Sequence, residues 1–218
     1  MCTSIESEEF KVKYPRTNHV PWTESMSDDD RIHKSMFNFY GKRVIVTEKM
    51  DGENTSMYCN DIHARSIDGR HHHSRDWVKS FWSTIAMDIP KGWRVCGENL
   101  YAEHSIAYKS LPTYFMGFSI WNEKNECLSW DETLEWFLLI GIVSVPILYD
   151  GIYDEKKIIA LYDSDVDWNK REGYVVRLAD SFSYDDFKYS VAKFVRKNHV
   201  GTSDHWMFNQ SIHKNELA

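Results

Sequence analysis

The stretch from Arg43 to Tyr58, with the sequence RVIVTEKMDGENTSMY, constrains the fold of this chain more than any other. Its first half is a run of alternating apolar residues of the kind found in β-strands, and a second apolar run follows. The connection contains Asp51 and Gly52, which are typical turn residues. Lys49 stands at the start of this turn, where a small polar residue is the usual choice. The pattern predicts two strands joined by a turn and leaves the lysine to be explained by function.

Other segments rich in β-branched or aromatic residues are also expected to be strands. Together with the first strand they are Arg43–Lys49, Thr55–Cys59, Trp93–Gly97, Tyr114–Trp121, Tyr174–Leu178 and Ser190–Val195. Helices are expected over SRDWVKSFWSTIA, which has apolar residues on one face, and over DEKKIIALY. A further helix is expected over SWDETLEWFLLIG, which opens with a capping box of Ser129 and Glu132 and ends at Gly141.

The order of these elements predicts the fold class. Strands come in groups between separate helices, without regular βαβ alternation, which favours an α+β fold with mainly antiparallel sheets. The 218 residues suit one domain with a small appendage. We expect residues 1–40 to form an irregular N-terminal arm that leads into a helix near Asp28 to Phe37, and residues 41–218 to form one compact domain with that arm.

Charge and cysteine usage limit the possible partners. The net charge of −7 argues against nonspecific binding of nucleic acid over the whole surface, although a local basic groove is compatible with it. Four well-separated cysteines and the lack of a signal peptide predict reduced thiols and a cytoplasmic location. The longest apolar stretch, WFLLIGIVSVPIL, is shorter than the ~20 residues of a membrane-spanning helix, so no membrane role is expected.

A nucleophilic lysine would explain the turn at Lys49. Its amine must be neutral to attack, so its pKa must be lowered by nearby cations or by desolvation. The natural electrophile is phosphorus, which requires basic side chains around its oxygens and a metal ion held by carboxylates. Such residues stand at strand ends elsewhere in the chain: Glu98 in VCGENLY, Glu172 in REGYVVRL, Arg65 in HARSIDGR, and Lys193, Arg196 and Lys197 in SVAKFVRKNHV.

With these residues in place, the chain resembles the covalent nucleotidyltransferases, which include the ATP- and NAD-dependent ligases and the mRNA capping enzymes. The segment KMDGEN resembles motif I of that superfamily, written KxDG. The further motifs follow in the family's order: Arg65 for motif Ia, CGENLY for motif III, FMGFSIW for motif IIIa, EGYVVR for motif IV and AKFVRK for motif V. A lone KxDG is weak evidence, whereas the ordered set is specific.

Within the superfamily the chain is most similar to the RNA ligases. Asn54 is typical of RNA ligases of the bacteriophage type, and KYPRTNHVPW and CLSWDET resemble segments of small RNA ligase-like proteins from bacteria and phages. The resemblance implies a nucleotidyltransferase (ATP-grasp-like) domain of antiparallel sheets flanked by helices. Only 25 residues follow Lys193, which leaves no room for the C-terminal oligonucleotide-binding (OB) barrel that DNA ligases and capping enzymes usually carry.

The resemblance also implies an activity, with ATP and Mg²⁺ or Mn²⁺ as cofactors. An ATP-dependent RNA ligase joins RNA 3′-hydroxyl and 5′-phosphate ends through lysyl-AMP and RNA-adenylate intermediates, as in RNA repair. In this interpretation Lys49 is the nucleophile that takes AMP, and Asn54 assists at the 5′-phosphate end. Glu172 binds the metal, and Glu98 holds the ribose hydroxyls or organises the metal.

Other residues are expected around the nucleotide. Arg65 would contact the ribose or the terminal phosphate, and Glu48 the adenine–ribose edge or the metal site. Lys193 would neutralise the α-phosphate, with either Arg196 or Lys197 as the second cation of motif V. Phe118 would stack on adenine, although Phe115 and Trp121 compete for that role.

Alternatives of other classes stay open at this point. A capping-type guanylyltransferase would use GTP, and a noncatalytic protein would bind RNA ends while keeping the nucleotide site. The expected partners are RNA ends, with a nicked duplex among the candidate substrates, and by analogy an end-healing kinase or phosphatase. The oligomeric state is open. The adjacent His71, His72 and His73 cannot all face one zinc ion and are interpreted, with Arg70 and Arg75, as a polar loop near RNA phosphates.

Overall fold

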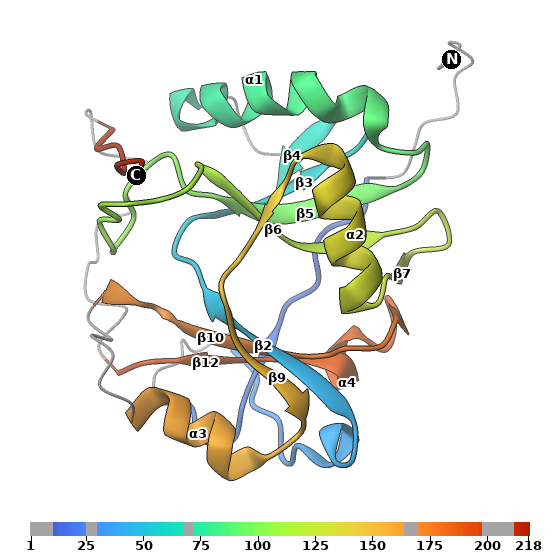
Figure 1. Ribbon diagram of the computed structural model, residues 1–218, viewed down its shortest axis with the longest axis vertical. Helices are drawn as coiled ribbons and strands as arrows, with labels where there is room; N and C mark the ends of the chain where they lie inside the picture. The colour runs from blue at the N-terminus through green and yellow to red at the C-terminus, as the bar shows by residue number, and fades with distance from the viewer. Residues whose placement is uncertain (1–10, 25–29, 68–71, 164–169, 198–211) are drawn as a thin grey trace.

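The computed structural model describes residues 11–24, 30–67, 72–163, 170–197 and 212–218. Two sheets stack on each other, and helices cover their outer faces (Figure 1). The fold is therefore α+β with mainly antiparallel sheets, as the order of elements predicts.

The first sheet, sheet A, has five strands in the order β1-β12-β10-β2-β9. Their bounds are β1 Asn18–His19, β2 Arg43–Lys49, β9 Ile147–Ile152, β10 Gly173–Leu178 and β12 Val191–Val195. Neighbouring strands are antiparallel except for β1, which runs parallel to β12. The N-terminal arm thus supplies the edge strand beside the C-terminal strand of the sheet.

The second sheet, sheet B, has the order β11-β7-β6-β5-β3-β4, and β8 pairs with β6 beside this path. The bounds are β3 Glu53–Met57, β4 Ile62–Ala64, β5 Arg94–Asn99, β6 Phe115–Trp121, β7 Glu126–Cys127, β8 Val143–Ser144 and β11 Phe182–Ser183. The chain passes from sheet A to sheet B through the turn after Lys49, so this turn lies where the two sheets meet (Figure 1).

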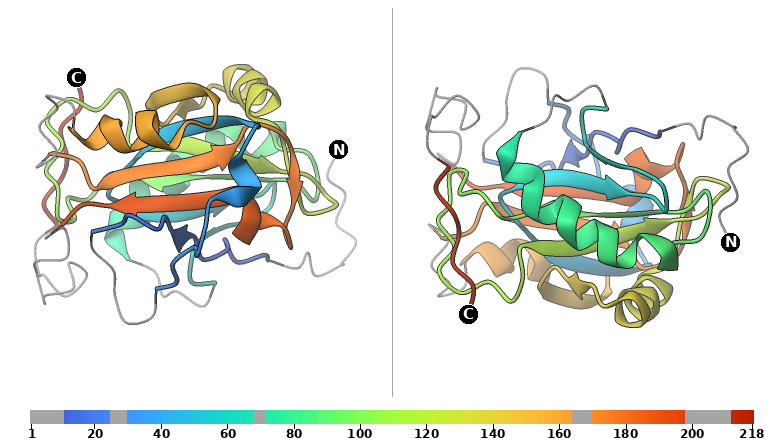
Figure 2. Two further views of the ribbon diagram at one scale, coloured as in Figure 1. Left: turned by 90° about the horizontal axis from the view of Figure 1, so that it is seen from below. Right: turned by 90° about the horizontal axis from the view of Figure 1, so that it is seen from above.

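The helices pack on the outer faces of the two sheets. They are α1 Asp76–Ile85, α2 Trp130–Ile140, α3 Glu155–Asp163 and the single turn α4 Phe187–Ser190, with 3₁₀ turns at Phe37–Phe39, His73–Arg75 and Ala86–Asp88. Figure 2 shows α1 lying across sheet B in the view from above. Helix α2 begins with the expected capping box of Ser129 and Glu132, and Gly141 ends it with φ of 72°.

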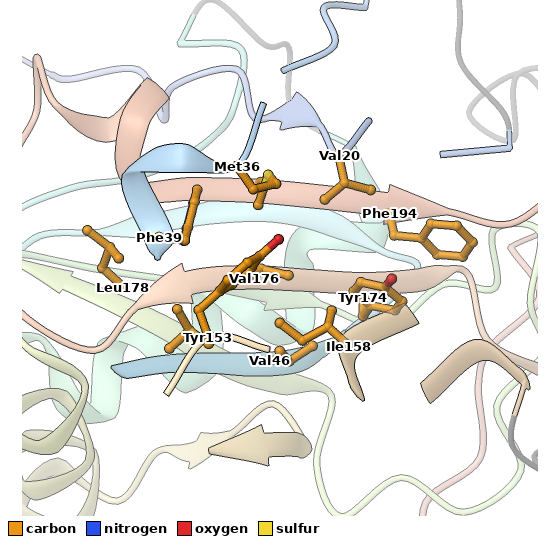
Figure 3. Close-up of a cluster of buried hydrophobic side chains, with 12 residues drawn as sticks. Val20, Met36, Phe39, Val46, Tyr153, Ile158, Tyr174, Val176, Leu178 and Phe194 are labelled. Carbon is orange, nitrogen blue, oxygen red and sulfur yellow. The ribbon is translucent and has the colours of Figure 1, made fainter. Parts of the chain in front are cut away.

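The alternation along β2 separates its two faces. Val44 and Val46 point into the core between sheet A and α3, where they pack with Ile158 and the aromatic rings of Tyr174 and Phe194 (Figure 3). The residues that alternate with them along the strand, including Lys49, face the space between the two sheets. Val44 and Val46 thus supply core packing, and the C-terminal end of the strand, from Thr47 to Lys49, supplies the functional site.

Most of the sequence-based elements agree with the structure. All six expected strands and three of the four expected helices are present. The expected helix from Asp28 to Phe37 is wrong for its described part: residues 30–36 are not helical, and only Phe37–Phe39 forms a 3₁₀ turn. The backbone there bonds to the arm instead, since His19 N donates to Arg31 O at 2.7 Å and His33 N donates to His19 O at 2.8 Å. Asp28 and Asp29 lie outside the described residues.

Strand β9 was not expected from the sequence. It is an edge strand whose residues from Ile147 to Ile152 are exposed or half-buried, so it lacks the buried alternation that identified the others. Cys59, Cys96 and Cys127 are free thiols. None of the helices in the described part of the chain combines the length and the apolar character needed to cross a bilayer.

Candidate active site

A cavity of about 430 Å³ lies between the two sheets at the turn after β2. Sheet A contributes β2, β10 and β12 to its walls, sheet B contributes β3, β5, β6, β7 and β11, and the N-terminal arm closes one side. Seven residues predicted from the sequence line it: Glu48, Lys49, Asn54, Arg65, Glu98, Phe118 and Lys193. The fold therefore gathers into one hollow residues that are up to 145 positions apart in the chain.

Lys49, the last residue of β2, forms an ion pair with Glu172, which immediately precedes β10. The antiparallel register of β2 and β10 places Lys49 opposite Gly173, so the preceding Glu172 lies beside the lysine. The Lys49 Nζ and Glu172 Oε2 atoms are 2.5 Å apart. Gly173 permits this arrangement, because a Cβ there would lie 1.9 Å from the Phe194 carbonyl oxygen. The nucleophile predicted from motif I and the metal-binding carboxylate predicted from motif IV are thus direct neighbours.

The electrostatic state of Lys49 differs from the expectation. Burial lowers the pKa of its ammonium group, but the negative charges of Glu172, Glu98 and Asp51 together outweigh burial and raise the pKa above its usual value. The expected lowering of the pKa is therefore wrong for the ligand-free protein, because carboxylates rather than cations dominate around the amine. Lys193 behaves in the opposite way, since burial lowers its pKa in spite of its ion pair with Asp30.

Glu98 faces Lys49 from sheet B. It pairs with Asn54 in the register of β5 and β3, which brings both side chains to the cavity. Burial raises the pKa of Glu98 to about 8; Lys49 acts against this rise, and the nearby Glu172 and Asp51 add to it. A crowded pair of carboxylates of this kind is stabilised by a bound cation.

Asp51 and Gly52 of motif I hold neighbouring backbone segments in place around the site. Asp51 Oδ2 accepts hydrogen bonds from Ser105 N at 2.8 Å, Ser105 Oγ at 2.7 Å and Ile106 N at 2.9 Å. These bonds fix the loop that carries His104 into the cavity wall. A Cβ at Gly52 would lie 2.5 Å from the carbonyl oxygen of Asn99, so only glycine fits this close approach to β5.

Two predicted residues, Asn54 and Arg65, lie side by side and carry buried polar atoms. Arg65 N donates to Asn54 O at 2.9 Å, which holds the two residues side by side. Asn54 Oδ1 and Arg65 Nε are buried, and neither has a hydrogen-bond partner among the described residues. Buried polar atoms are nearly always satisfied in folded proteins, so these two atoms mark a candidate position for a ligand.

Among the three aromatic residues considered for the base, the structure brings Phe118 to the cavity. Phe118 is half-buried and lines the wall, whereas Phe115 and Trp121 are both 0% exposed and lie in the cores behind it. Its role in stacking stays a prediction. Glu48 also lines the cavity, where its Oε2 lies 3.1 Å from Arg171 Nε and burial raises its pKa despite this partner.

The second cation of motif V is not brought to the cavity by the described structure. The Arg196 guanidinium donates to the backbone carbonyls of Arg171 at 2.8 Å and Lys197 at 3.3 Å, and neither Arg196 nor Lys197 belongs to the cavity wall. Arg177 from motif IV lines the wall instead. It shares the inner face of β10 with Val175, so strand alternation is a signal that could have identified it.

Further wall residues had no signal in the sequence. Tyr14 and Arg16 from the arm and His104 from the loop after β5 line the cavity through tertiary folding alone. Of the histidine cluster, His72 Nδ1 lies 2.8 Å from Ser74 Oγ, and His73 Nδ1 lies 3.0 Å from Asp76 Oδ2. Arg70 and His71 lie outside the described residues.

The carboxylates suit a divalent ion that is shared with a nucleotide. In the described part of the chain, no three His, Cys, Asp or Glu side chains are arranged to hold a metal by themselves. Mg²⁺ needs only one or two protein carboxylates when phosphate oxygens and waters complete its octahedron. The charge of Glu172 helps to raise the pKa of Glu98, and this pair of carboxylates fits that requirement.

Comparisons with known proteins identify the family of the chain. The family model described as RNA ligase matches residues 42–195, which is most of the chain. A comparison with functionally curated proteins finds no match.

Solved structures share the fold. A Naegleria gruberi RNA ligase variant with AMP and Mn is 18% identical, with a TM-score of 0.53 over 78% of this chain and 55% of that one. Another variant of the same ligase, with ATP and Mn, is also 18% identical, with a TM-score of 0.53 over 84% and 60%. At this identity the likeness shows the fold alone, and this chain spans little more than half the length of those proteins.

Proposed function

The chain belongs to the RNA ligase family, and from this premise we propose that it is an ATP-dependent ligase that joins RNA 3′-hydroxyl and 5′-phosphate ends. The observation that carries the proposal is that Lys49, which pairs with Glu172 at 2.5 Å, lines one cavity together with Glu98, Lys193 and Phe118. A nucleophile, carboxylates, a phosphate-binding cation and an aromatic ring thereby meet in a single hollow. Each has a task in moving a nucleotide onto a lysine.

In the first step the neutral amine of Lys49 attacks the α-phosphorus of ATP. A nitrogen–phosphorus bond forms, the bond between the α- and β-phosphates breaks, pyrophosphate leaves and Nζ gives up a proton. Glu172 Oε2, 2.5 Å from Nζ, is the nearest base and also aims the amine. Lys193, on the inner face of β12, balances the charge of the α-phosphate.

The later steps are also displacements at phosphorus. A 5′-phosphate oxygen of the RNA attacks the phosphorus of the lysyl-AMP, which breaks the nitrogen–phosphorus bond and restores Lys49. The RNA 3′-hydroxyl then attacks the activated 5′-phosphorus, so that a phosphodiester forms and AMP leaves. Asn54 Oδ1 and Arg65 Nε, which have no hydrogen-bond partner among the described residues, lie on the sheet B side of the cavity and would contact the RNA end in these steps.

Glu172 and Glu98 would hold the divalent ion together with the phosphates. When bound, Mg²⁺ or Mn²⁺ adds positive charge beside the amine, which lowers the pKa of Lys49 and balances the charge on the phosphate oxygens. This supplies the cationic surroundings that the protein side chains alone do not provide, since they raise the pKa of Lys49.

RNA ends are the proposed partners, and a nicked duplex is one candidate substrate. An end-healing kinase or phosphatase would prepare the 5′-phosphate and 3′-hydroxyl that the reaction requires. The cytoplasmic location inferred from the cysteines stays a prediction.

The proposal is tested by incubating the protein with ATP and Mg²⁺ and measuring its mass. An added AMP on a peptide that contains Lys49 is expected, and Lys49→Ala should lose it by a factor of roughly 1,000 or more, because the attacking amine itself is removed. Lys124→Ala, at an exposed turn outside the cavity, is the matched control and should keep the adduct. Labelling by GTP alone would indicate guanylyl transfer, and no adduct with either nucleotide would indicate a noncatalytic binder.

A further inference from the structure

The N-terminal arm crosses from one sheet to the other beside the cavity. We call residues 12–17 the strap. Val12 N donates to the Tyr58 hydroxyl at 3.0 Å at the end of β3, and the Tyr184 hydroxyl donates to Lys13 O at 2.8 Å next to β11. The chain then enters sheet A, where Asn18 pairs with Ala192 of β12. In Figure 1 this dark-blue segment runs from the upper sheet to the lower one.

Tyr14 is the residue of the strap that reaches deepest into the molecule. Its ring meets Phe118 edge to face, with centroids 5.2 Å apart and planes at 72°, and it meets Phe187 at 5.4 Å and 84°. Burial raises the pKa of the Tyr14 hydroxyl far above its usual value, so the hydroxyl is neutral, and it forms a hydrogen bond with the buried Ser119. Tyr14 and Phe118 both line the cavity, so the strap and β6 form adjoining parts of one wall.

We propose that Tyr14 positions the nucleotide base by holding the Phe118 ring at a fixed angle to the cavity. Phe118 is half-buried, so its own strand does not fully enclose the ring. An edge-to-face contact is favourable only over a narrow range of ring angles, and Tyr14 is itself fixed by Phe187, Ser119 and the two strap anchors. The inference rests on the proposed function, because Phe118 serves a base only if the cavity binds a nucleotide.

The two hydrogen bonds that anchor the strap allow the positioning role of Tyr14 to be tested separately from the folding of the whole domain. Tyr58 and Tyr184 hold the strap through their hydroxyl groups and are absent from the cavity wall. Removing one hydroxyl therefore loosens the strap without changing the wall itself. Tyr14→Phe keeps the ring and removes only the bond to Ser119, whereas Tyr14→Leu removes the aromatic contact.

The test measures the rate of AMP adduct formation against ATP concentration. Tyr14→Leu should raise the KM for ATP by roughly three- to tenfold, the range expected for one aromatic pair, while the rate at saturating ATP changes less than about twofold. The KM for pyrophosphate in the reverse step should stay within about twofold of the parent value, because no base is taken up there. Tyr14→Phe should restore most of the ATP affinity.

Two further variants complete the design. Tyr184→Phe should raise the KM for ATP by only about twofold, since it loosens the strap by one hydrogen bond. Tyr189→Leu, at a site 48% exposed on α4, is the matched control and should leave both KM values unchanged. Thermal unfolding of every variant should be recorded alongside.

The outcomes separate this inference from the proposed function. An unchanged KM for ATP in Tyr14→Leu would overturn the positioning role. So would an equal loss in both KM values and in the saturated rate, because that pattern marks general disruption of the cavity. If the parent protein itself forms no adduct with ATP, the proposed function fails instead.

Discussion

The two sheets offer the cavity different kinds of polar groups. On sheet A the charges already have partners within the protein: Lys49 with Glu172 at 2.5 Å, and Lys193 with Asp30 at 3.1 Å. On the side of sheet B, the buried atoms Asn54 Oδ1 and Arg65 Nε have no hydrogen-bond partner among the described residues. The charges on the sheet A wall are thus neutralised within the protein, whereas two buried atoms on the sheet B wall lack hydrogen-bond partners among the described residues.

This difference shows how a ligand-free site of this kind can be both stable and ready to bind. Internal counter-charges hold the reacting amine of sheet A in place and offset the cost of burying it. The buried polar atoms on the side of sheet B carry an uncompensated free-energy cost of desolvation, and a ligand that forms hydrogen bonds with them would offset that cost. We therefore propose that the charged pairs of sheet A serve nucleotide attachment and that Asn54 and Arg65 on the side of sheet B serve the RNA end, and the following variants test that division.

Among the variants that test this division, the largest effect is expected from removing the counter-charge on sheet A. Glu172→Gln keeps the shape of the side chain but loses the ion pair at 2.5 Å and one proposed metal ligand. Adduct formation at pH 7.5 should fall by roughly 100-fold or more, a size typical of losing one preorganised electrostatic group. The measurement is the single-turnover rate of AMP attachment.

The same variant has a second readout in its pH profile. Glu172 contributes to the raised pKa of Lys49, so its loss should move the alkaline rise in rate towards lower pH. Glu135→Gln on the exposed side of α2 is the matched control. A Glu172→Gln protein with parental rate and an unshifted profile would contradict the assignment of attachment chemistry to sheet A.

A smaller effect, confined to a later step, is expected on sheet B. Asn54→Ala should leave attachment of AMP to Lys49 nearly unchanged and slow the sealing of a 5′-phosphorylated nick by roughly tenfold or more, as for a lost hydrogen bond to a charged group. Its unpartnered Oδ1 lies buried in the wall. The first step of the same protein serves as the internal control, and equal losses in both steps would break the division between the sheets.

The smallest effect concerns the pH dependence of stability beside β4. His63 Nδ1 donates to Ala64 O at 2.6 Å, and Nε2 is buried without a hydrogen-bond partner among the described residues. Burial lowers the pKa of His63 below 6.5, so its contribution to stability is present above pH 6.5 and is lost as the pH falls below that value. Each pKa unit of lowering corresponds to about 1.4 kcal/mol.

His63→Asn keeps a donor for Ala64 and removes the titration. Urea unfolding at pH 7.5 and at pH 5.5 should show a smaller drop in unfolding free energy for the variant than for the parent protein. An identical drop would mean that His63 does not contribute to the pH dependence. Attachment of AMP at pH 7.5 should be unaffected, because His63 lies outside the wall of the large cavity.

Much of the site could be predicted because its residues stand at the ends of regular strands. Lys49 ends β2, Glu172 precedes β10 and Glu98 lies near the end of β5, so alternation and turn residues located them. The N-terminal region was harder. Its residues from Asp30 to Met36 carry no buried periodicity, because their backbone bonds to the arm at His19 instead of to itself.

The sequence by itself indicated six strands, three helices and seven of the residues that line the cavity, because these depend on local periodicity and on short motifs. Only the tertiary structure decided that carboxylates raise the pKa of Lys49, that Arg177 takes a place in the wall where Arg196 does not, and that Tyr14 packs against Phe118. The physical reason is that charge balance, burial and ring contacts depend on distances between segments far apart in the chain, and no local pattern of residues encodes those distances.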